Sequence, residues 1–488
     1  MTGLVVRITL IYKSNSITTA SLSMHTQPTP SLVRFLQPVM ITAALATFLL
    51  ALALPVRTGA TPPPGFTTTP LVLSGGSAEP EISIGKDGTM AMVSISFVGT
   101  YVWTGPFGSP PVFQGIVDGA LQHPGRLVFG GNDADVDIGS TGRLHITSGI
   151  ALEPPTLNHG QSGVSAITCP SPALGSFSAN QCTAQLIDTT TTDRPWITSD
   201  ASHVYISYHD SGNSSLIHVQ RSDDDGFTWK RVGDPIVGQG GLTVSAHFLS
   251  VDGNLVADPH THNVYAVYVA RETAETLTPN HVIVSRSNDM GETWTANVVF
   301  ADPPGIRLGN LFPALAVDPV TGNLYAVWSD GHTIGFASST DQGNTWTPAM
   351  TVNSPPATTA LFPWVAAYNG VVDVVYYGTT AASHLDPSAD WHVYFAQFNG
   401  LIFTQTQVNA AANHHGVVCT NGGACGPGTR NLLDLFQLAI DPQNAKAAII
   451  YTDDTLTTTN DPNIDNFTCS PNQSPPCPLP QAVLAQQN

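Results

Sequence analysis

One eight-residue pattern occurs three times in the chain and restricts its fold more than any other feature. The pattern is Ser-x-Asp-x-Gly-x-Thr-Trp, and its copies occupy residues 222–229, 287–294 and 339–346. These residue types are typical of a tight hairpin, because Asp accepts hydrogen bonds from backbone N–H groups and Gly adopts positive φ. The Trp can then pack under a neighbouring strand. Copies that begin 65 and 52 residues apart predict a repeated unit the size of one small sheet.

We therefore predict a structural role for this motif and regard a catalytic role of its Asp residues as the weaker interpretation. The residues expected to build the three turns are Ser222, Asp224, Gly226 and Trp229, then Ser287, Asp289, Gly291 and Trp294, and finally Ser339, Asp341, Gly343 and Trp346.

The composition supports a β protein and excludes several other classes. Only 10% of residues are charged, against about 25% in an average soluble protein, and the formal net charge is −19. A chain this acidic lacks the basic face that nucleic-acid binding requires. The 42% hydrophobic content argues against disorder. The 43 Gly and 38 Pro exclude coiled coils and most helical bundles.

The sequence around the third copy predicts one four-stranded antiparallel sheet, with strands at 310–318, 324–328, 333–338 and 345–352. The same template fits six other stretches, the last of which has only two strands. We expect that unit to be completed by a strand from the other end of the chain, Thr69–Leu73. Radial repetition of this kind predicts an all-β propeller of four-stranded blades, with seven blades as our prediction. Six blades are the alternative, which the family resemblance described next implies.

The three motif copies resemble the Asp-box repeats, also called bacterial neuraminidase repeats, of sialidase-like β-propellers. In that family the box lies at a hairpin on the outer part of a blade, away from the active site. The stretches 193–196 and 430–434 also resemble parts of secreted bacterial Asp-box proteins that have no assigned reaction. The resemblance implies the propeller fold and a sialidase-like arrangement without supplying an activity.

The first sixty residues have the features of an export segment. They contain no Asp or Glu, and Arg34 precedes an apolar run over 35–56. A basic region, an apolar region and small residues after it predict a secretory signal and an extracellular location. An uncleaved membrane anchor is the alternative, and Met1 and Met24 are both open as the start. Removal of this segment takes away four basic residues and moves the net charge from −19 to −23.

We divide the chain into four segments. The export segment covers 1–60, and a Pro/Thr-rich linker that includes the closing strand covers 61–78. The propeller covers 79–460, and a Cys- and Pro-rich tail covers 461–488.

The six cysteines form three local pairs in the sequence, and short loops close at the lowest entropic cost. We predict disulfides within each pair, which also fits export. Zinc-binding thiols are the less favoured alternative, because the spacings do not match a zinc site. The predicted pairs are Cys169 with Cys182, Cys419 with Cys425, and Cys469 with Cys477.

Polar residues recur where the predicted innermost strands begin. The loops that lead into these strands converge on one face of a propeller, and we expect a ligand to bind there. The candidates at these positions are Asp133, Asp135, Asp193, Arg194, Arg307, Trp364, Arg430 and Asp434.

The resemblance to sialidases suggests roles for some of these residues. It implies Arg194, Arg307 and Arg430 as ligands of a substrate carboxylate, a geometry that suits Arg. It implies Asp133 or Asp135 as the acid and Glu272 as the residue that activates a Tyr nucleophile. The chain departs from the family because the Arg-Ile-Pro motif is missing near the first blade, and no Tyr stands out as the nucleophile.

Two functions remain in view, and whether the chain is an enzyme stays open. The first is a secreted, non-catalytic propeller that binds a glycan or an extracellular protein, its polar residues tying blades together. The second is a sialidase-like glycoside hydrolase. We expect a monomer with no cofactor, no nucleic-acid partner, and a membrane contact only if the apolar segment is retained. Calcium at Asp133, Asp135 and Asp137 is an alternative that requires a loop rather than a strand.

Overall fold

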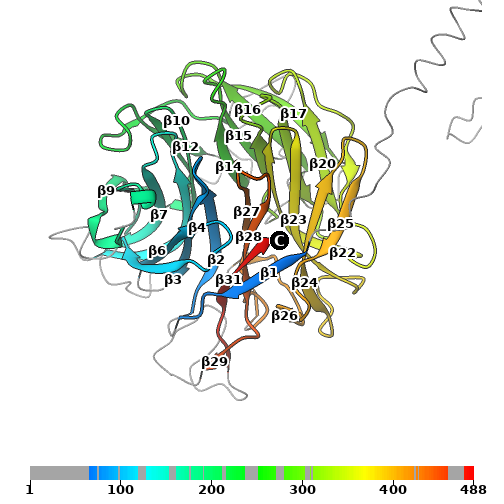
Figure 1. Ribbon diagram of the computed structural model, residues 1–488. Helices are drawn as coiled ribbons and strands as arrows, with labels where there is room; N and C mark the ends of the chain where they lie inside the picture. Colours follow the sequence, from blue (N-terminus) through cyan, green and yellow to red (C-terminus); the bar gives the residue numbers. More distant parts are fainter. Residues whose placement is uncertain are drawn as a thin grey trace, which may run out of the picture. The chain divides into compact units, whose positions relative to one another are not determined.

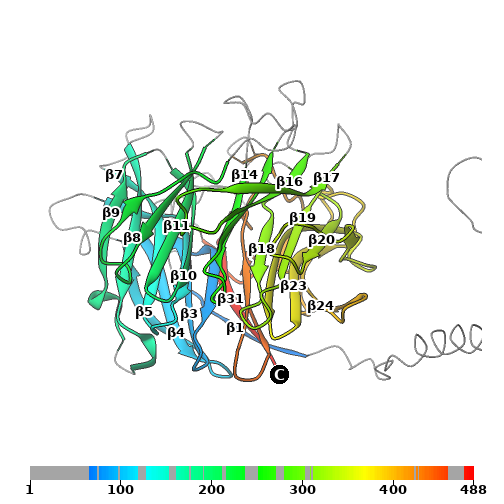
Figure 2. The ribbon, with the colours of Figure 1, turned by 90° about the horizontal axis from the view of Figure 1, so that it is seen from above.

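The computed structural model describes residues 65–73, 76–96, 99–118, 128–152, 161–174, 177–190, 192–210, 216–236, 251–270, 280–302, 308, 311–422, 425–426, 428–459 and 477–488. The chain divides into Met1–Pro62 and Pro63–Asn488, and all described residues belong to the second unit. The export segment and the alternative anchor expected there lie outside the described residues. The second unit is an all-β propeller of seven blades, as predicted (Figures 1 and 2).

The blades are numbered here in chain order, and each begins with its innermost strand. Blade 1 contains β2 (Ala78–Ile84), β3 (Thr89–Ser96), β4 (Gly99–Pro106) and β5 (Val112–Val117). Blade 2 contains β6 (Val128–Ile138), β7 (Leu144–Leu152), β8 (Gln161–Cys169) and β9 (Thr183–Asp188). Blade 3 contains β10 (Thr192–Asp200), β11 (His203–Asp210), β12 (Ile217–Ser222) and β13 (Lys230–Arg231). Blade 4 contains β14 (Val251–Ala257), β15 (Val264–Ala270), β16 (His281–Ser287) and β17 (Thr295–Ala301).

The remaining blades follow the same plan. Blade 5 contains β18 (Ala314–Val317), β19 (Leu324–Ser329), β20 (Ile334–Ser339) and β21 (Met350–Thr351). Blade 6 contains β22 (Thr359–Tyr368), β23 (Val371–Thr379), β24 (Asp390–Phe398) and β25 (Phe403–Gln407), with the short β26 (His414–His415) paired to β24. Blade 7 contains β27 (Gln437–Ile440), β28 (Ala447–Asp453), β31 (Gln481–Gln487) and β1 (Phe66–Pro70). A small hairpin joins β29 (Thr458–Thr459) to β30 (Cys477–Pro478), and the helices described are two 3-10 turns, η1 (Pro172–Leu174) and η2 (Ala179–Gln181).

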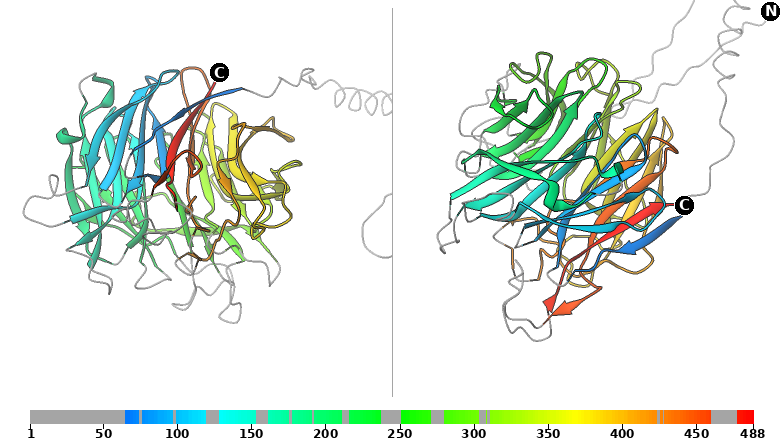
Figure 3. Two further views of the ribbon diagram at one scale, coloured as in Figure 1. Left: turned by 90° about the horizontal axis from the view of Figure 1, so that it is seen from below. Right: turned by 60° about the vertical axis from the view of Figure 1, so that its left-hand side comes forward.

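Blade 7 closes the ring with strands from both ends of the described chain. β1 pairs antiparallel with β31, Phe66 opposite Gln487, and the two strands lie side by side in Figures 1 and 3. The expected closing strand therefore exists, but it begins at Phe66 and ends at Pro70, earlier than predicted. The assignment of 461–488 as a tail outside the propeller was wrong, because its last residues form the third strand of this blade. β31, from the end of the chain, pairs with the edge of β28 that β27 leaves open.

Each copy of the repeated motif forms the hairpin between the third and fourth strands of a blade, as predicted. In the first copy, Ser222 Oγ donates to Asp224 Oδ1 at 2.8 Å and accepts from the Gly226 N–H at 2.9 Å. Asp224 also accepts from the N–H and the hydroxyl of Thr228, both at 2.7 Å. The same four hydrogen bonds recur in the other two copies. The Asp carboxylates are therefore occupied by their own turns.

Arginines connect consecutive blades beside these hairpins. The residue before the first motif copy, Arg221, donates to the carbonyl oxygen of Met290 in the hairpin of the next blade. The residue before the second copy, Arg286, donates to the carbonyl oxygen of Gln342 in the third hairpin at 3.0 Å. The position before the third copy is Ser338, and blade 6, which follows, has no such hairpin. Among the three copies, an Arg thus precedes the motif only where the next blade has a hairpin that can accept its hydrogen bond.

Apolar side chains fill the spaces between the sheets. The largest cluster of buried residues runs through blades 3 to 7 and includes Trp391, Tyr376 and Phe395. Two of the three predicted disulfides, Cys169–Cys182 and Cys419–Cys425, are present. The third, Cys469–Cys477, falls outside the described residues. Within the ranges described, no helix is long and apolar enough to cross a bilayer.

Candidate functional site

The innermost strands share a kink close to their first residues. Register shifts interrupt the pairing of β2, β6, β10, β14 and β22 with their neighbours near these starts. At this place the backbone takes a positive φ in Glu79 (47°), Asp133 (42°), Arg194 (49°) and Phe362 (53°), and in Leu433 (55°) just before β27. Such a bulge bends a strand and redirects its side chains. We call the face where innermost strands begin the start face and the opposite face the end face.

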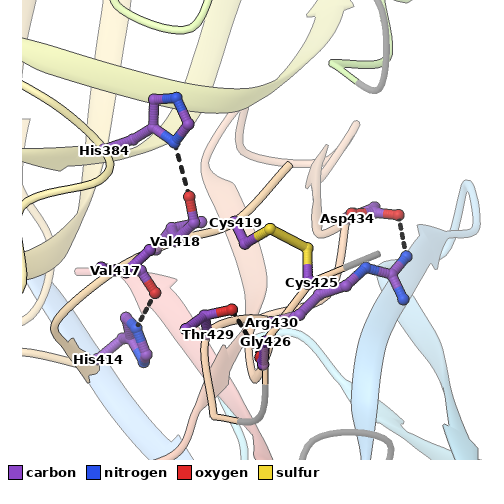
Figure 4. The surroundings of a disulfide bond; sticks show 10 residues. All are labelled: His384, His414, Val417, Val418, Cys419, Cys425, Gly426, Thr429, Arg430 and Asp434. Atoms are coloured by element: carbon purple, nitrogen blue, oxygen red, sulfur yellow. Dashed lines mark hydrogen bonds and ion pairs between the residues drawn. A yellow bond between two sulfur atoms is a disulfide. The ribbon is translucent and has the colours of Figure 1, made fainter. Parts of the chain in front are cut away.

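The redirected side chains of the start face form one ionic network across the propeller axis. Arg194 Nη1 lies 2.7 Å from Asp193 Oδ2, and Arg194 Nη2 lies 3.7 Å from Asp434 Oδ2. Arg430 pairs with the same Asp434 oxygen (Figure 4). The chain of Arg430 is held near this point by the disulfide between Cys419 and Cys425, drawn in the same view. Two guanidinium groups from distant blades therefore share one carboxylate.

Other members of this network bind the backbone of the next blade. Asp133 Oδ2 accepts from the Arg194 N–H at 2.9 Å, and Glu79 Oε1 accepts from the Asp434 N–H at 2.9 Å. Asp135 Oδ2 accepts from the Ile197 N–H at 2.9 Å. These contacts join blade 2 to blade 3 and blade 7 to blade 1. Polar residues at these positions thus link neighbouring blades, which is the structural role considered for them.

Carboxylates outnumber cations around the axis, and the pKa values of two of them are raised. Burial raises the pKa of Glu79 well above its ordinary value, and the charges of Asp133 and Asp434 raise it further. Burial likewise raises the pKa of Asp133 to about 6, with the charge of Asp193 acting in the same direction. Burial disfavours the charged form of Arg194, but the Asp193 and Asp434 carboxylates outweigh it and raise that pKa. The two Arg residues thus balance part of the negative charge, and the raised pKa of Glu79 favours its protonated form.

An aromatic layer closes the axis beneath the network. The rings of Trp196 and Trp364, from blades 3 and 6, are stacked with centroids 5.5 Å apart. The Arg194 guanidinium lies 3.9 Å from the centroid of the Phe312 ring. The space left between Trp364, Phe312 and Phe436 is only about 10 Å³, about the least that can hold one water molecule. Little space therefore connects the start-face network with the other half of the axis.

A large cavity occupies the axis on the end-face side of this layer. Its volume is about 780 Å³, and residues from all seven innermost strands line it. Its walls carry short side chains such as Ser83, Thr198 and Ala366, and its floor includes Trp364. Lys86 and other exposed turn residues form its rim. A cavity of this size, with polar side chains among apolar ones, is the usual form of a small-ligand site.

The structure brings most of the residues singled out in the sequence together. Asp133, Asp193, Arg194, Arg430 and Asp434 meet at the start face. Asp135 and Trp364 lie one layer deeper, where both also line the cavity.

Glu272 and Arg307 lie outside the described residues, so their places in the site stay predictions. Three further acidic residues, Glu79, Glu81 and Asp252, are buried near the axis and were not predicted from the sequence. Glu79 precedes Pro80 near the start of β2, just as Arg194 precedes Pro195 near the start of β10. This match could have identified Glu79 from the sequence.

The calcium alternative depends on the backbone around three aspartates of one segment. Asp133, Asp135 and Asp137 all lie on β6, a strand rather than a loop. The described ranges contain no group of three or more Asp, Glu, His or Cys side chains placed to hold a metal ion.

Neither a protein-family model nor a curated protein sequence matches this chain. Among solved structures, a protein of unknown function from Dyadobacter fermentans is 12% identical with a TM-score of 0.47, over 87% of this chain and 100% of its own. Aleuria aurantia lectin is 9% identical with a TM-score of 0.42, over 69% and 96%. Trypanosoma rangeli sialidase is 13% identical with a TM-score of 0.42, over 65% and 55%. These likenesses concern the fold alone.

Proposed function

We propose that this chain is an exported, non-catalytic propeller that binds a carbohydrate in the end-face cavity. The observation that supports this proposal is the cavity itself, about 780 Å³ in volume, lined by all seven blades and open at a rim of exposed turns. A concave site of this size suits a short saccharide better than a protein surface, which would need a broad and flatter interface.

The lining chemistry fits a sugar. Hydroxyl side chains such as those of Ser83 and Thr198 stand among aliphatic residues of the wall, whereas the buried Asn254 amide is bonded to the backbone of Leu315. Tyr368, partly exposed, adds an aromatic ring to the wall. Carbohydrates present the same alternation of hydroxyl groups and C–H faces. This match favours a glycan over a purely apolar ligand.

The hydrolase alternative requires accessible arginines, and the described ones are engaged. Arg194 is paired with Asp193 and Asp434, lies over Phe312, and its side chain is only 12% exposed. A substrate carboxylate at the start face would have to displace the protein's own carboxylates from both Arg194 and Arg430. No observation at the start face favours this second function over binding. Hydrolysis of fluorogenic sialosides by the full-length chain would reverse that preference.

Export is part of the proposal. Two disulfides within the propeller fit a chain that folds in an oxidising compartment. The apolar run over 35–56 supplies the export signal in the sequence. Fractionation of the native source, followed by N-terminal sequencing of the protein, would show whether the segment is removed.

The test of binding is calorimetric titration of the full-length chain with a panel of neutral, acidic and amino oligosaccharides. Ala366→Trp fills the cavity, because Ala366 lies two residues after Trp364 on the same face of β22. We expect this variant to abolish binding of whichever sugar the wild type takes. Ala349→Trp, at an exposed position outside the cavity lining, is the matched control. Binding that survives Ala366→Trp, or no binding across the panel, would contradict the proposal.

A further inference from the structure

We propose that the ligand of the end-face cavity is an oligosaccharide that continues into a second binding space, a side groove between blades 1 and 2. This inference rests on the carbohydrate binding proposed above and extends it to the length of the sugar chain. One end of the chain lies in the cavity, and the adjoining unit lies in the side groove.

The side groove adjoins the cavity at the turns that follow β2 and β6. Its volume is about 230 Å³, and its walls include residues 85–87 of blade 1 and residues 138–142 and 171–173 of blade 2. Lys86, Ile138 and Ser140 line both the cavity and the side groove. The two spaces are therefore neighbours at the rim, and one extended ligand can occupy both.

The cavity is closed at its inner end by the aromatic layer. Trp364 belongs to its floor, and the space beside Phe312 and Phe436 measures only about 10 Å³. A saccharide chain cannot pass through so small a space, so a chain that enters the cavity ends there. Every further unit of such a chain lies at the rim or beyond it.

The hydroxyl side chains of the cavity lie on the same side as the side groove. The Ser and Thr residues of the lining all belong to blades 1 to 3, and they are Ser83, Ser140, Thr198 and Ser199. Blades 4 to 7 instead present partly exposed aliphatic side chains, those of Val256, Val317, Ala366 and Ala439. A sugar chain that follows these hydroxyl groups toward the rim reaches the turns of blades 1 and 2.

The rim itself differs in the same direction. In blades 4, 5 and 7 the lining includes a proline from the turn after the innermost strand, and a proline has no N–H to donate; these residues are Pro259, Pro319 and Pro442. Blades 1 and 2 place the exposed Lys86 and Ser140 at the corresponding turns. Both side chains can donate to a sugar hydroxyl. The partly exposed Ser171 adds a further hydroxyl inside the side groove.

The test is calorimetric titration of the full-length chain with sugars of increasing length. The probes are the monomer, dimer and trimer of β-1,4-linked glucose, of β-1,4-linked N-acetylglucosamine and of α-1,4-linked glucose. We expect the trimer of the series that binds to have an affinity at least about tenfold above that of its monomer. Any other oligosaccharide of the panel that binds is compared with its own terminal monosaccharide in the same way.

A variant that fills the side groove assigns this gain to its place. Ala173→Trp introduces a large side chain from an exposed position in the lining of the side groove. We expect it to lower the affinity for the trimer to that for the monomer and to leave the affinity for the monomer unchanged. Ala349→Trp, exposed and outside both linings, is the matched control and should keep the gain.

Each other outcome overturns a defined part of the argument. Equal affinity of the wild type for monomer and trimer would overturn the side groove as a binding space and leave carbohydrate binding standing. A gain with length that survives Ala173→Trp would also overturn it, because the next unit would then lie elsewhere at the rim. Failure of every sugar would overturn carbohydrate binding itself. If Ala173→Trp does not fold, Ser171→Phe obstructs the same groove and replaces it in the comparison.

Discussion

The guanidinium of Arg221 at the end of β12 donates a 2.5 Å hydrogen bond to the main-chain carbonyl oxygen of Met290 in the next blade. The same side chain is within 3.2 Å of Glu292 in that blade and 2.7 Å of Asp223 in its own. It is only 6% exposed. One Arg therefore fixes the outer edge of blade 3 against the hairpin of blade 4.

We predict that Arg221→Ala lowers the free energy of unfolding by about 1.5–3 kcal/mol, the range for hydrogen bonds to a charged group. Ser338→Ala, at the equivalent position before a blade without the hairpin, should change it by less than about 0.5 kcal/mol. Urea unfolding followed by Trp fluorescence measures both. Equal effects of the two variants would show that the contact between blades adds nothing.

The Asp of each hairpin motif is predicted to stabilise its turn. Asp289→Ala removes acceptors for the Ser287 hydroxyl and for the N–H and hydroxyl of Thr293. We expect a loss of about 1–3 kcal/mol in the free energy of unfolding. Asn288→Ala, the exposed neighbour, is the matched control and should be close to neutral. A stable Asp289→Ala variant would mean that water replaces these acceptors without cost.

The repeated hairpins and the blades were predictable because their signals are local. Turn chemistry within eight residues and apolar strands on both sides of it are sufficient to place β20 and β21 around the third motif copy. The pairing of Arg194 and Arg430 on Asp434 was not predictable. The Arg194 contact depends on closure of a ring, because Arg194 and Asp434 are 240 positions apart in the sequence, whereas Arg430 is only four positions from Asp434.

The end-face cavity gave even less signal in the sequence. Its walls are residues such as Val256, Ala366 and Ala439, which look like ordinary strand interior. Side chains of this size leave space only because seven strands surround an axis wider than the side chains can fill. The polar residues that predicted a ligand site lie on the start face, whereas the described cavity lies at the other end of the axis.

Arg194 is predicted to stabilise the fold through its ion pairs at the propeller axis. Arg194→Met keeps much of the side-chain volume but leaves Asp193 and Asp434 without one of their cations. Removal of one partner from a buried ion pair costs about 3–5 kcal/mol. Arg231→Met, which breaks the more exposed pair with Asp234, should cost less than about 1 kcal/mol. Thermal unfolding of both variants tests this difference, and similar melting temperatures would contradict it.

The two disulfides are predicted to contribute unequally to stability. Cys169–Cys182 closes a loop with a sequence separation of 13, and Cys419–Cys425 one with a separation of 6. The entropy of loop closure then gives about 3 and about 2 kcal/mol for their removal. Cys169→Ala/Cys182→Ala and Cys419→Ala/Cys425→Ala, unfolded in urea, measure the two contributions. A larger loss from the shorter loop would indicate that its bond stabilises native contacts near Arg430 rather than restricting the unfolded chain.

The buried carboxylates are predicted to make the propeller more stable in mild acid than at pH 8. Burial raises the pKa of Asp133 and Asp137 to about 6 and of Asp135 and Asp373 to about 7. Unfolded Asp titrates near 3.9, so the native state binds more protons between roughly pH 4 and pH 7. The stability from these protons is fully present below the unfolded pKa and is lost as pH rises through the folded values.

Because each pKa unit corresponds to about 1.4 kcal/mol, we expect a fall of several kcal/mol in the free energy of unfolding between pH 5 and pH 8. Urea titrations at pH 5, 6, 7 and 8 measure it. Asp373→Asn removes one of the four groups at a site away from the cavity, where its partner is Gln397, and should flatten the slope near pH 7. Stability that stays constant or rises over this interval would mean that cations rather than protons neutralise the buried acids.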